Sequence, residues 1–109
     1  MAALTVSGNH GILNGTTPVT LVSSPGVGVS RMVRALYINH TDSDPVVLHI
    51  LKDYNTSQYQ IHSQTMLQGY TLSFGDGDSI ILVNGESLIA WLDSSPVTNP
   101  NFVVSWGDI

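Results

Sequence analysis

The chain has 109 residues, a length suited to one domain, so no second domain is expected. Charged residues make up only 10% of it, against about 25% in soluble domains, which is typical of a subunit that contacts other proteins, with a neutral-surfaced monomer as the alternative. The formal net charge of −5 argues against phosphate neutralisation of nucleic acid, and the lack of cysteine excludes disulfides, thiolate metal sites and a cysteine nucleophile.

Apolar and polar residues alternate with a period of two in one short segment after another, and turn-forming residues gather between these segments. This pattern predicts about eight strands and no helix. The predicted strands are residues 19–23, 31–39, 46–53, 59–65, 70–74, 79–83, 87–92 and 102–106. Strands this short, with no helix to cover them, bury their apolar faces on one another, so we expect an all-β antiparallel sandwich or barrel.

The N-terminal part carries few strand signals beyond Leu4-Thr5-Val6 and is rich in Gly and Asn. We expect residues 1–29 to form an arm with the first strand or strands, lying against a neighbour, or else a disordered terminus. Residues 30–109 are the predicted sandwich core. No basic leader precedes an apolar run, and no segment has the length of a membrane span, so we expect a soluble chain that is not secreted.

Side-chain alternation also predicts which strand faces are buried. Residues 59–65 have a dry face with Tyr59 and Ile61 and a wet face with Gln58, Gln60, His62 and Gln64. Residues 46–53 and 87–92 are apolar on both faces, with Val47, Leu51, Ile89 and Trp91 opposite Val46, Leu48, Ile50, Leu88, Ala90 and Leu92. One face fills the core and the other needs a second cover, so we expect isolated chains to be oligomeric.

Three glycine-containing turns invite interpretation. Asn84-Gly85 is the strongest hairpin signal, because a type I′ turn needs positive φ at both central residues, and it should join residues 79–83 to residues 87–92. Gly75-Asp76-Gly77-Asp78 resembles part of a calcium loop but lacks the later ligands, so a tight turn is favoured. The Gly-x-Gly run that begins at Gly26 has Arg31 in place of a third glycine, which favours a flexible link over a dinucleotide site.

No group of residues predicts catalysis, a cofactor or a metal site. The four histidines, His10, His40, His49 and His62, lack metal-site spacing and are expected as isolated surface residues, although His49 and His62 would be neighbours if their strands pair. No nucleophile elbow is present, and no carboxylate pair stands out among acidic residues that mostly lie in turns. The three cations, Arg31, Arg34 and Lys52, are expected at solvated positions or paired with acidic groups of a neighbour.

The run from Met32 to Thr41, a short turn and the following Pro45-Val46-Val47-Leu48-His49-Ile50 resemble the start of a family of small tailed-bacteriophage virion proteins. Further likeness lies in residues 59–62 and 72–74, in Gly85-Glu86-Ser87-Leu88 and in the closing Phe102-Val103-Val104-Ser105-Trp106. In such proteins the first strand ends in Asn-x-Thr, and a valine-rich strand ends the chain. The likeness covers about residues 30–109, and the Gly- and Asn-rich opening departs from it.

The resemblance implies a jelly-roll-like sandwich that self-associates on the head, neck or tail of a virion. Among these places we favour capsid decoration, in which a cement protein bridges major capsid subunits, as a homotrimer or else a dimer, after assembly in the host cytoplasm. The alternatives are a head-to-tail connector or tail-associated subunit, and a displayed carbohydrate-binding module. Aromatic residues that could stack on sugar rings are Tyr37, Tyr54, Tyr59, Tyr70, Trp91 and Trp106.

Overall fold

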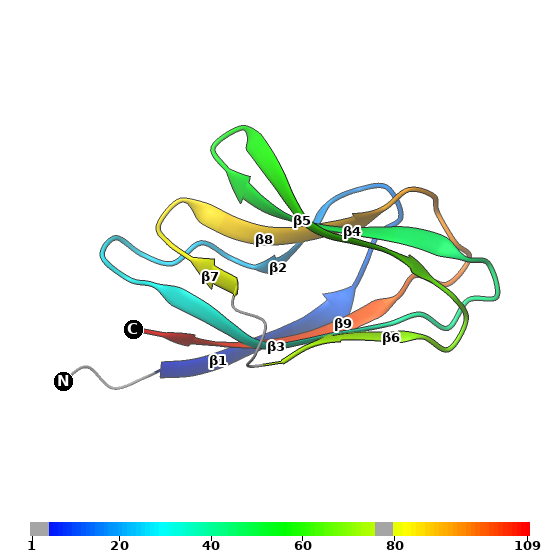
Figure 1. Ribbon diagram of the computed structural model, residues 1–109, viewed down its shortest axis with the longest axis horizontal. Helices are drawn as coiled ribbons and strands as arrows, with labels where there is room; N and C mark the ends of the chain where they lie inside the picture. Colours follow the sequence, from blue (N-terminus) through cyan, green and yellow to red (C-terminus); the bar gives the residue numbers. More distant parts are fainter. Residues whose placement is uncertain (1–4, 76–79) are drawn as a thin grey trace.

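The computed structural model describes residues 5–75 and 80–109, which form nine strands and no helix. The strands are β1 (Thr5–Ile12), β2 (Val19–Val22), β3 (Arg31–Asn39), β4 (Val46–Tyr54), β5 (Ser57–Met66), β6 (Thr71–Phe74), β7 (Ile80–Leu82), β8 (Glu86–Leu92) and β9 (Asn101–Asp108). They make two antiparallel sheets that lie face to face (Figure 1). The predicted all-β antiparallel sandwich is confirmed.

The strand pairing is nested, and this gives the sandwich its jelly-roll topology. In sheet I the order is β1-β9-β3-β6, with the short β7 also paired to β3, and in sheet II it is β2-β8-β4-β5. The innermost pair is the β4–β5 hairpin, and successive outer pairs are β3 with β6, β2 with β8, and β1 with β9. One long hairpin rolled up in this way places alternate pairs in opposite sheets, and β7 is an extra strand between β6 and β8.

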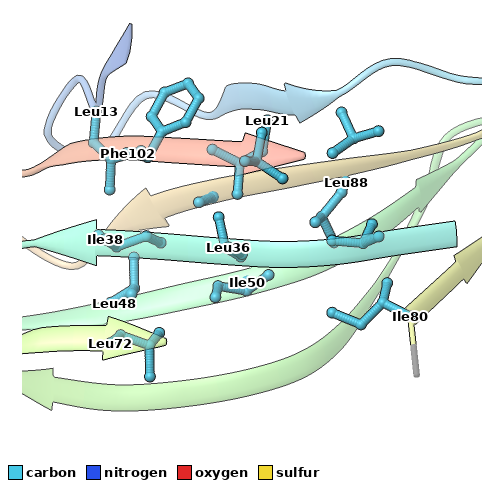
Figure 2. Packing of buried hydrophobic residues seen from close by; sticks show 14 of the residues in the cluster. Leu13, Leu21, Leu36, Ile38, Leu48, Ile50, Leu72, Ile80, Leu88 and Phe102 are labelled. Carbon is cyan, nitrogen blue, oxygen red and sulfur yellow. The ribbon is translucent and has the colours of Figure 1, made fainter. Parts of the chain in front are cut away.

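The core lies between the inner faces of the two sheets (Figure 2). Leu36 and Ile38 of β3 and Phe102 of β9 face it from sheet I, while Leu48 and Ile50 of β4 face it from sheet II. Four of these five side chains are completely buried, and Phe102 is 2% exposed. Full burial stabilises each such side chain by roughly 1.5–3 kcal/mol relative to exposure, so this shared interior holds the two layers together.

The N-terminal segment, expected as an arm, forms an edge strand of its own chain. From Thr5 to Ile12 it pairs with β9 in one unbroken register. Gly11 stands opposite Phe102, and a Cβ atom at Gly11 would lie 3.1 Å from the Phe102 ring. Gly11, which weakens the strand signal, therefore lets the Phe102 ring lie close to the β1 backbone, in the manner of an aromatic covering an edge glycine.

The hairpin predicted at Asn84-Gly85 is wrong. The strands on either side belong to different sheets, because β7 pairs with β3 whereas β8 lies between β2 and β4. The turn closes through a hydrogen bond from Glu86 N to Val83 O of 2.9 Å, and only Gly85 has a positive φ, at 93°. This is type II geometry, which changes layers at the sandwich corner instead of continuing one sheet.

The alternation predicted for residues 59–65 is also wrong, because β5 contains a bulge. His62 pairs with the core residue Ile50, and the register then shifts so that Ile61 is left unpaired between Gln60 and His62. The expected dry side chains are exposed, Tyr59 to 58% and Ile61 to 40%. A single inserted residue reverses the faces of every position beyond it, and a period-two pattern cannot reveal it.

Candidate interaction surface

The outer face of sheet I forms a grid of side chains set by the strand register. Residues opposite one another in antiparallel strands point to the same side, so each row runs across neighbouring strands. The rows, from one end of the sheet to the other, are Ile12–Asn101–Asn39–Thr71, His10–Val103–Tyr37–Ser73, Gly8–Ser105–Ala35, and Gly107–Met32–Ile81. We call these residues the sheet I face.

The rows of the sheet I face are uncharged and partly apolar, and the half-buried Arg34 lies beside them at the register shift of β3 between Val33 and Ala35. None of the residues in its rows is Asp, Glu, Lys or Arg. Its exposed apolar side chains are Ile12 at 66%, Val103 at 51%, Tyr37 at 46%, Ile81 at 44% and Met32 at 40%. Contact through these rows alone removes no charge from water, and depletion of charge is what distinguishes the centre of an interface from ordinary surface.

One row of this face carries a hydrogen-bonded chain of polar side chains. Thr71 Oγ1 donates to Asn39 Oδ1 at 2.6 Å, and Asn39 Nδ2 donates to Asn101 Oδ1 at 2.9 Å. The three groups come from β6, β3 and β9 and hold one another in fixed positions. This row gives the face a rigid polar border beside Tyr37, as expected for a preorganised contact surface.

The outer face of sheet II differs from the expectation for it. Leu51 and Ile89, the residues expected to need a second cover, are opposite each other and only 6% and 5% exposed. Beside them the His49 ring stacks on Trp91 with centroids 4.5 Å apart, and His49 Nδ1 lies 2.8 Å from Gln60 Oε1. The outer-face residues of β4 and β8 are therefore largely buried within the chain. The exposed apolar side chains of sheet II, Tyr54, Tyr59 and Ile61, lie on the β4–β5 hairpin, and a second exposed group lies on the sheet I face.

The four histidines occupy four separate environments. His10 is exposed on β1, but His40 is only 1% exposed and its Nε2 lies 2.7 Å from Asp44 O, so the expectation of a surface residue is wrong for His40. His49 and His62 do lie on paired strands, yet His49 is opposite Ser63 and His62 opposite Ile50, which puts them on opposite faces. Among the described residues, no three His, Cys, Asp or Glu side chains gather closely enough to hold a metal ion.

Arg31 pairs within the chain, contrary to the expectation of a solvated or intermolecular position. Its Nε and Nη2 donate to the two Asp108 carboxylate oxygens at 2.8 and 3.0 Å, and Nη1 donates to Ser23 O at 2.7 Å. The guanidinium also lies 5.2 Å from the Trp106 ring centroid. The hydrogen-bonded Arg31 lowers the pKa of Asp108, and the same hydrogen bonds raise the pKa of Arg31. This clasp joins the β2–β3 link, β3 and the end of β9.

At the opposite end of the sandwich, Asp42 ties two loops together. Its Oδ1 accepts from Asp44 N at 2.8 Å, and its Oδ2 accepts from Thr98 N at 2.8 Å. These backbone hydrogen bonds hold the pKa of the Asp42 carboxyl below its ordinary value. Asp42 therefore joins the β3–β4 loop to the β8–β9 loop.

Lys52, like Arg31, pairs within the chain, because its Nζ lies 3.5 Å from Glu86 Oε1.

The aromatic residues proposed for sugar stacking are divided among different surroundings. Trp106 is 9% exposed in the core beneath Arg31, and Trp91 is stacked on His49. Tyr37 is 46% exposed on the sheet I face, while Tyr54 and Tyr59 lie on the projecting β4–β5 hairpin (Figure 1). Tyr70 accepts a hydrogen bond from Gln64 on the β5–β6 side. These rings do not form one platform.

Two glycine motifs have different outcomes. The run from Gly26 leads from β2 into β3, with Val29 N bonded to Gly26 O at 3.2 Å and no helix after it, which agrees with a link between the sheets. The calcium-like turn lies outside the described residues except for Gly75. The described part of the chain contains no helix long and apolar enough to cross a membrane.

No protein-family model matches the chain, and no curated protein matches it. The choice of the sheet I face as the candidate surface therefore rests on the register and exposure of its residues. Sequence reasoning missed His10 and Ile12 as members of that surface, because their strand was not predicted. The signal for this strand was a period of two, in which Gly8, His10 and Ile12 share one face and Ser7 and Asn9 the other. Small residues made this period weak.

Proposed function

We propose that this protein is a non-enzymatic structural protein of a tailed-phage virion, which stabilises the capsid by bridging major capsid subunits. The observation that carries the proposal is the sheet I face, where exposed apolar side chains stand in rows that contain no charged residue, with Arg34 beside them at the β3 register shift. The low overall charge and the resemblance of residues 30–109 to small virion proteins support the same assignment.

The mechanism is mechanical. Tyr37 and Val103, opposite each other on neighbouring strands, form the centre of the face that packs on a shell subunit. Separation of the shell then exposes that apolar surface to water, at about 25 cal/mol for each Å². The nested β-sandwich supplies a rigid support, because the face is backed directly by the buried core.

A double substitution tests this surface. Tyr37→Asp with Val103→Asp places two charges at the centre of the face, and we expect it to abolish incorporation into particles while the chain still folds. Thr65→Asp is the matched control, because Thr65 is exposed on the outer face of sheet II. Circular dichroism checks folding, and quantification of the chain in purified particles gives the result. Equal incorporation of the wild type, the double variant and Thr65→Asp would overturn the proposed surface.

Copy number separates capsid decoration from the connector alternative. A cement protein is present in numbers comparable to the major capsid subunit, whereas a connector or tail component is present in a dozen copies or fewer. The carbohydrate-binding alternative has one supporting observation, the exposed Tyr37 ring beside the Asn39 and Asn101 amides. A glycan array without signal would reject that alternative.

A further inference from the structure

The four sheet edges are protected unequally. An open edge presents unpaired backbone groups to other chains, and proteins block such edges with short strands, bulges, Pro or charged side chains. On sheet II, β2 has only four residues and a register shift, and β5 contains the bulge at Ile61. On sheet I, β6 has four residues. The remaining edge strand, β1, has eight residues, a continuous register and no Asp, Glu, Lys, Arg or Pro.

The hydrogen-bond pattern identifies which β1 groups are open. Leu13 N donates to Pro100 O at 2.9 Å, which extends the β1–β9 ladder by one position beyond the pair Ile12 and Asn101. Antiparallel positions alternate between bonded and non-bonded, so the odd-numbered residues of β1 bond to β9. The N–H and C=O groups of the even-numbered residues, including Gly8, His10 and Ile12, therefore point away from β9 along the edge.

The surroundings of this edge leave it accessible. From Ser7 to Ile12 every residue is exposed except the half-buried Gly11. Its only titratable side chain is His10, so two copies of the strand meet without like-charge repulsion. The Asn9 side chain is turned inward, where its Nδ2 donates to Leu21 O at 3.1 Å, and it leaves the backbone edge clear.

We propose that β1 pairs antiparallel with β1 of a second copy of this chain, about a twofold axis at Asn9. In that register Gly8 of each copy lies opposite His10 of the other, and Val6 opposite Ile12, which satisfies all four open residues of both strands. The pairing supplies about eight hydrogen bonds, two for each narrow pair. Identical antiparallel strands are self-complementary, so the contact closes as a dimer and does not grow into a fibre.

The pairing enlarges the sheet I face of the proposed function. This inference rests on that function, because it specifies how the proposed virion protein self-associates. The two copies of sheet I join into one continuous sheet, and the two sheet I faces lie side by side with His10 and Ile12 at the seam. The dimer presents twice the area of one sheet I face to adjacent shell subunits. This geometry favours the dimer over the homotrimer expected from the sequence.

Proline at the open edge tests the proposal. His10→Pro removes an N–H that points away from β9, so it blocks the second copy while it preserves the β1–β9 bonds. Two hydrogen bonds are lost across the symmetric pair, and we expect self-association roughly 10- to 100-fold weaker by sedimentation over a concentration series. His10→Ala keeps the N–H and should leave the dissociation constant within about twofold, since the side chain supplies no ladder bond.

Ser63→Pro is the matched control on the other long edge. The bond from Asp93 N to Val47 O of 3.1 Å directs Val47, and by alternation His49, toward β8. The N–H of Ser63, which is opposite His49 on the β5 edge, therefore points to solvent. We expect Ser63→Pro to leave the association unchanged. A monomeric wild-type chain, or equal weakening by Ser63→Pro and His10→Pro, would overturn the proposal.

A cross-link tests the register without dependence on a proline variant. The chain has no cysteine, so Asn9→Cys introduces one thiol at the proposed twofold axis, where opposed Cα atoms lie about 4.5 Å apart and permit a disulfide. Mild oxidation should give a covalent dimer from Asn9→Cys and none from Ser63→Cys. Failure of Asn9→Cys to cross-link would overturn the register. Cross-linking by a chain that is absent from particles would reject the virion function and leave the edge pairing intact.

Discussion

Removal of the Arg31 guanidinium is expected to destabilise the fold by about 2–3 kcal/mol, although it is one of only three Lys or Arg residues in a weakly charged chain. Its side chain is 14% exposed and that of Asp108 is 25% exposed, so the ion pair is screened only in part. We assign up to about 1 kcal/mol to the bidentate pair, roughly 1 kcal/mol to the bond to Ser23, and about 0.5–1 kcal/mol to the contact with Trp106.

The variant is Arg31→Ala, and thermal unfolding followed by circular dichroism is the assay. A change of 1 kcal/mol shifts the midpoint of a domain of this size by about 4 °C, so we expect a midpoint about 8–12 °C lower. Lys52→Ala is the control, because Lys52 makes one contact with Glu86 at 3.5 Å and should cost below about 0.5 kcal/mol. Arg31→Lys keeps the charge but lacks the planar guanidinium, so its unfolding midpoint should lie between those of Arg31→Ala and Lys52→Ala.

A double-mutant cycle of Arg31→Ala with Asp108→Asn isolates the ion pair from the other contacts. We expect a coupling free energy of about 0.5–1 kcal/mol, since both partners are partly exposed. If Arg31→Ala melted within about 2 °C of the wild type, the described clasp would contribute nothing to stability and the reasoning would fail.

Three further outcomes follow from local geometry. The Asp42 carboxylate accepts two backbone N–H groups, and its pKa is lowered from 3.8. Its contribution to stability is therefore present above pH 3.8 and is lost as the pH falls below that value. Asp42→Asn should weaken this acid dependence in thermal unfolding measured between about pH 2 and 7. Gly85→Ala should cost about 1–3 kcal/mol in urea unfolding, more than Gly28→Ala, because φ is positive at both positions but a Cβ atom meets a tyrosine ring at 3.0 Å only at Gly85. Leu36→Ala should cost about 3–4 kcal/mol by the same assay, whereas Tyr37→Ala, on the opposite face of β3, should cost well under half as much.

The sequence predicted the architecture well where apolar and polar residues alternate between turns. The bounds of β3 were predicted correctly, although a register shift at Arg34 interrupts its alternation and lets Val33, Leu36 and Ile38 all face the core. Absence of any helical period and the frequent turns predicted the sandwich. These signals are local, and a jelly roll built from short strands preserves them in nearly every element.

The parts that escaped prediction depend on contacts distant in the sequence. Gly11 is compatible with a strand because Phe102, far along the chain, lies against it. Asn84-Gly85 has the residue types of a hairpin turn, but β7 pairs with β3 in sheet I while β8 lies in sheet II. The ion pair of Arg31 with Asp108 likewise joins the start of β3 to the end of β9, and no spacing in the sequence indicates it.

The expectation that Leu51 and Ile89 need a second cover is wrong for a related reason. Apolar residues on both faces of β4 and β8 suggested an exposed sheet II, but cross-strand neighbours cover Leu51 and Ile89. The sheet I face was not predicted, because its members come from five strands whose order is known only from the fold. Exposure is a property of the assembled sheet and cannot be read from one strand.

The most direct measurement is an electron-microscopy map of the intact particle in which the proposed function places this chain. We expect density for the β-sandwich on the capsid, with Tyr37 and Val103 packed against a shell subunit and two β1 strands paired about a twofold axis. A particle without the chain, or a sandwich attached through sheet II with the sheet I face open to solvent, would contradict the account.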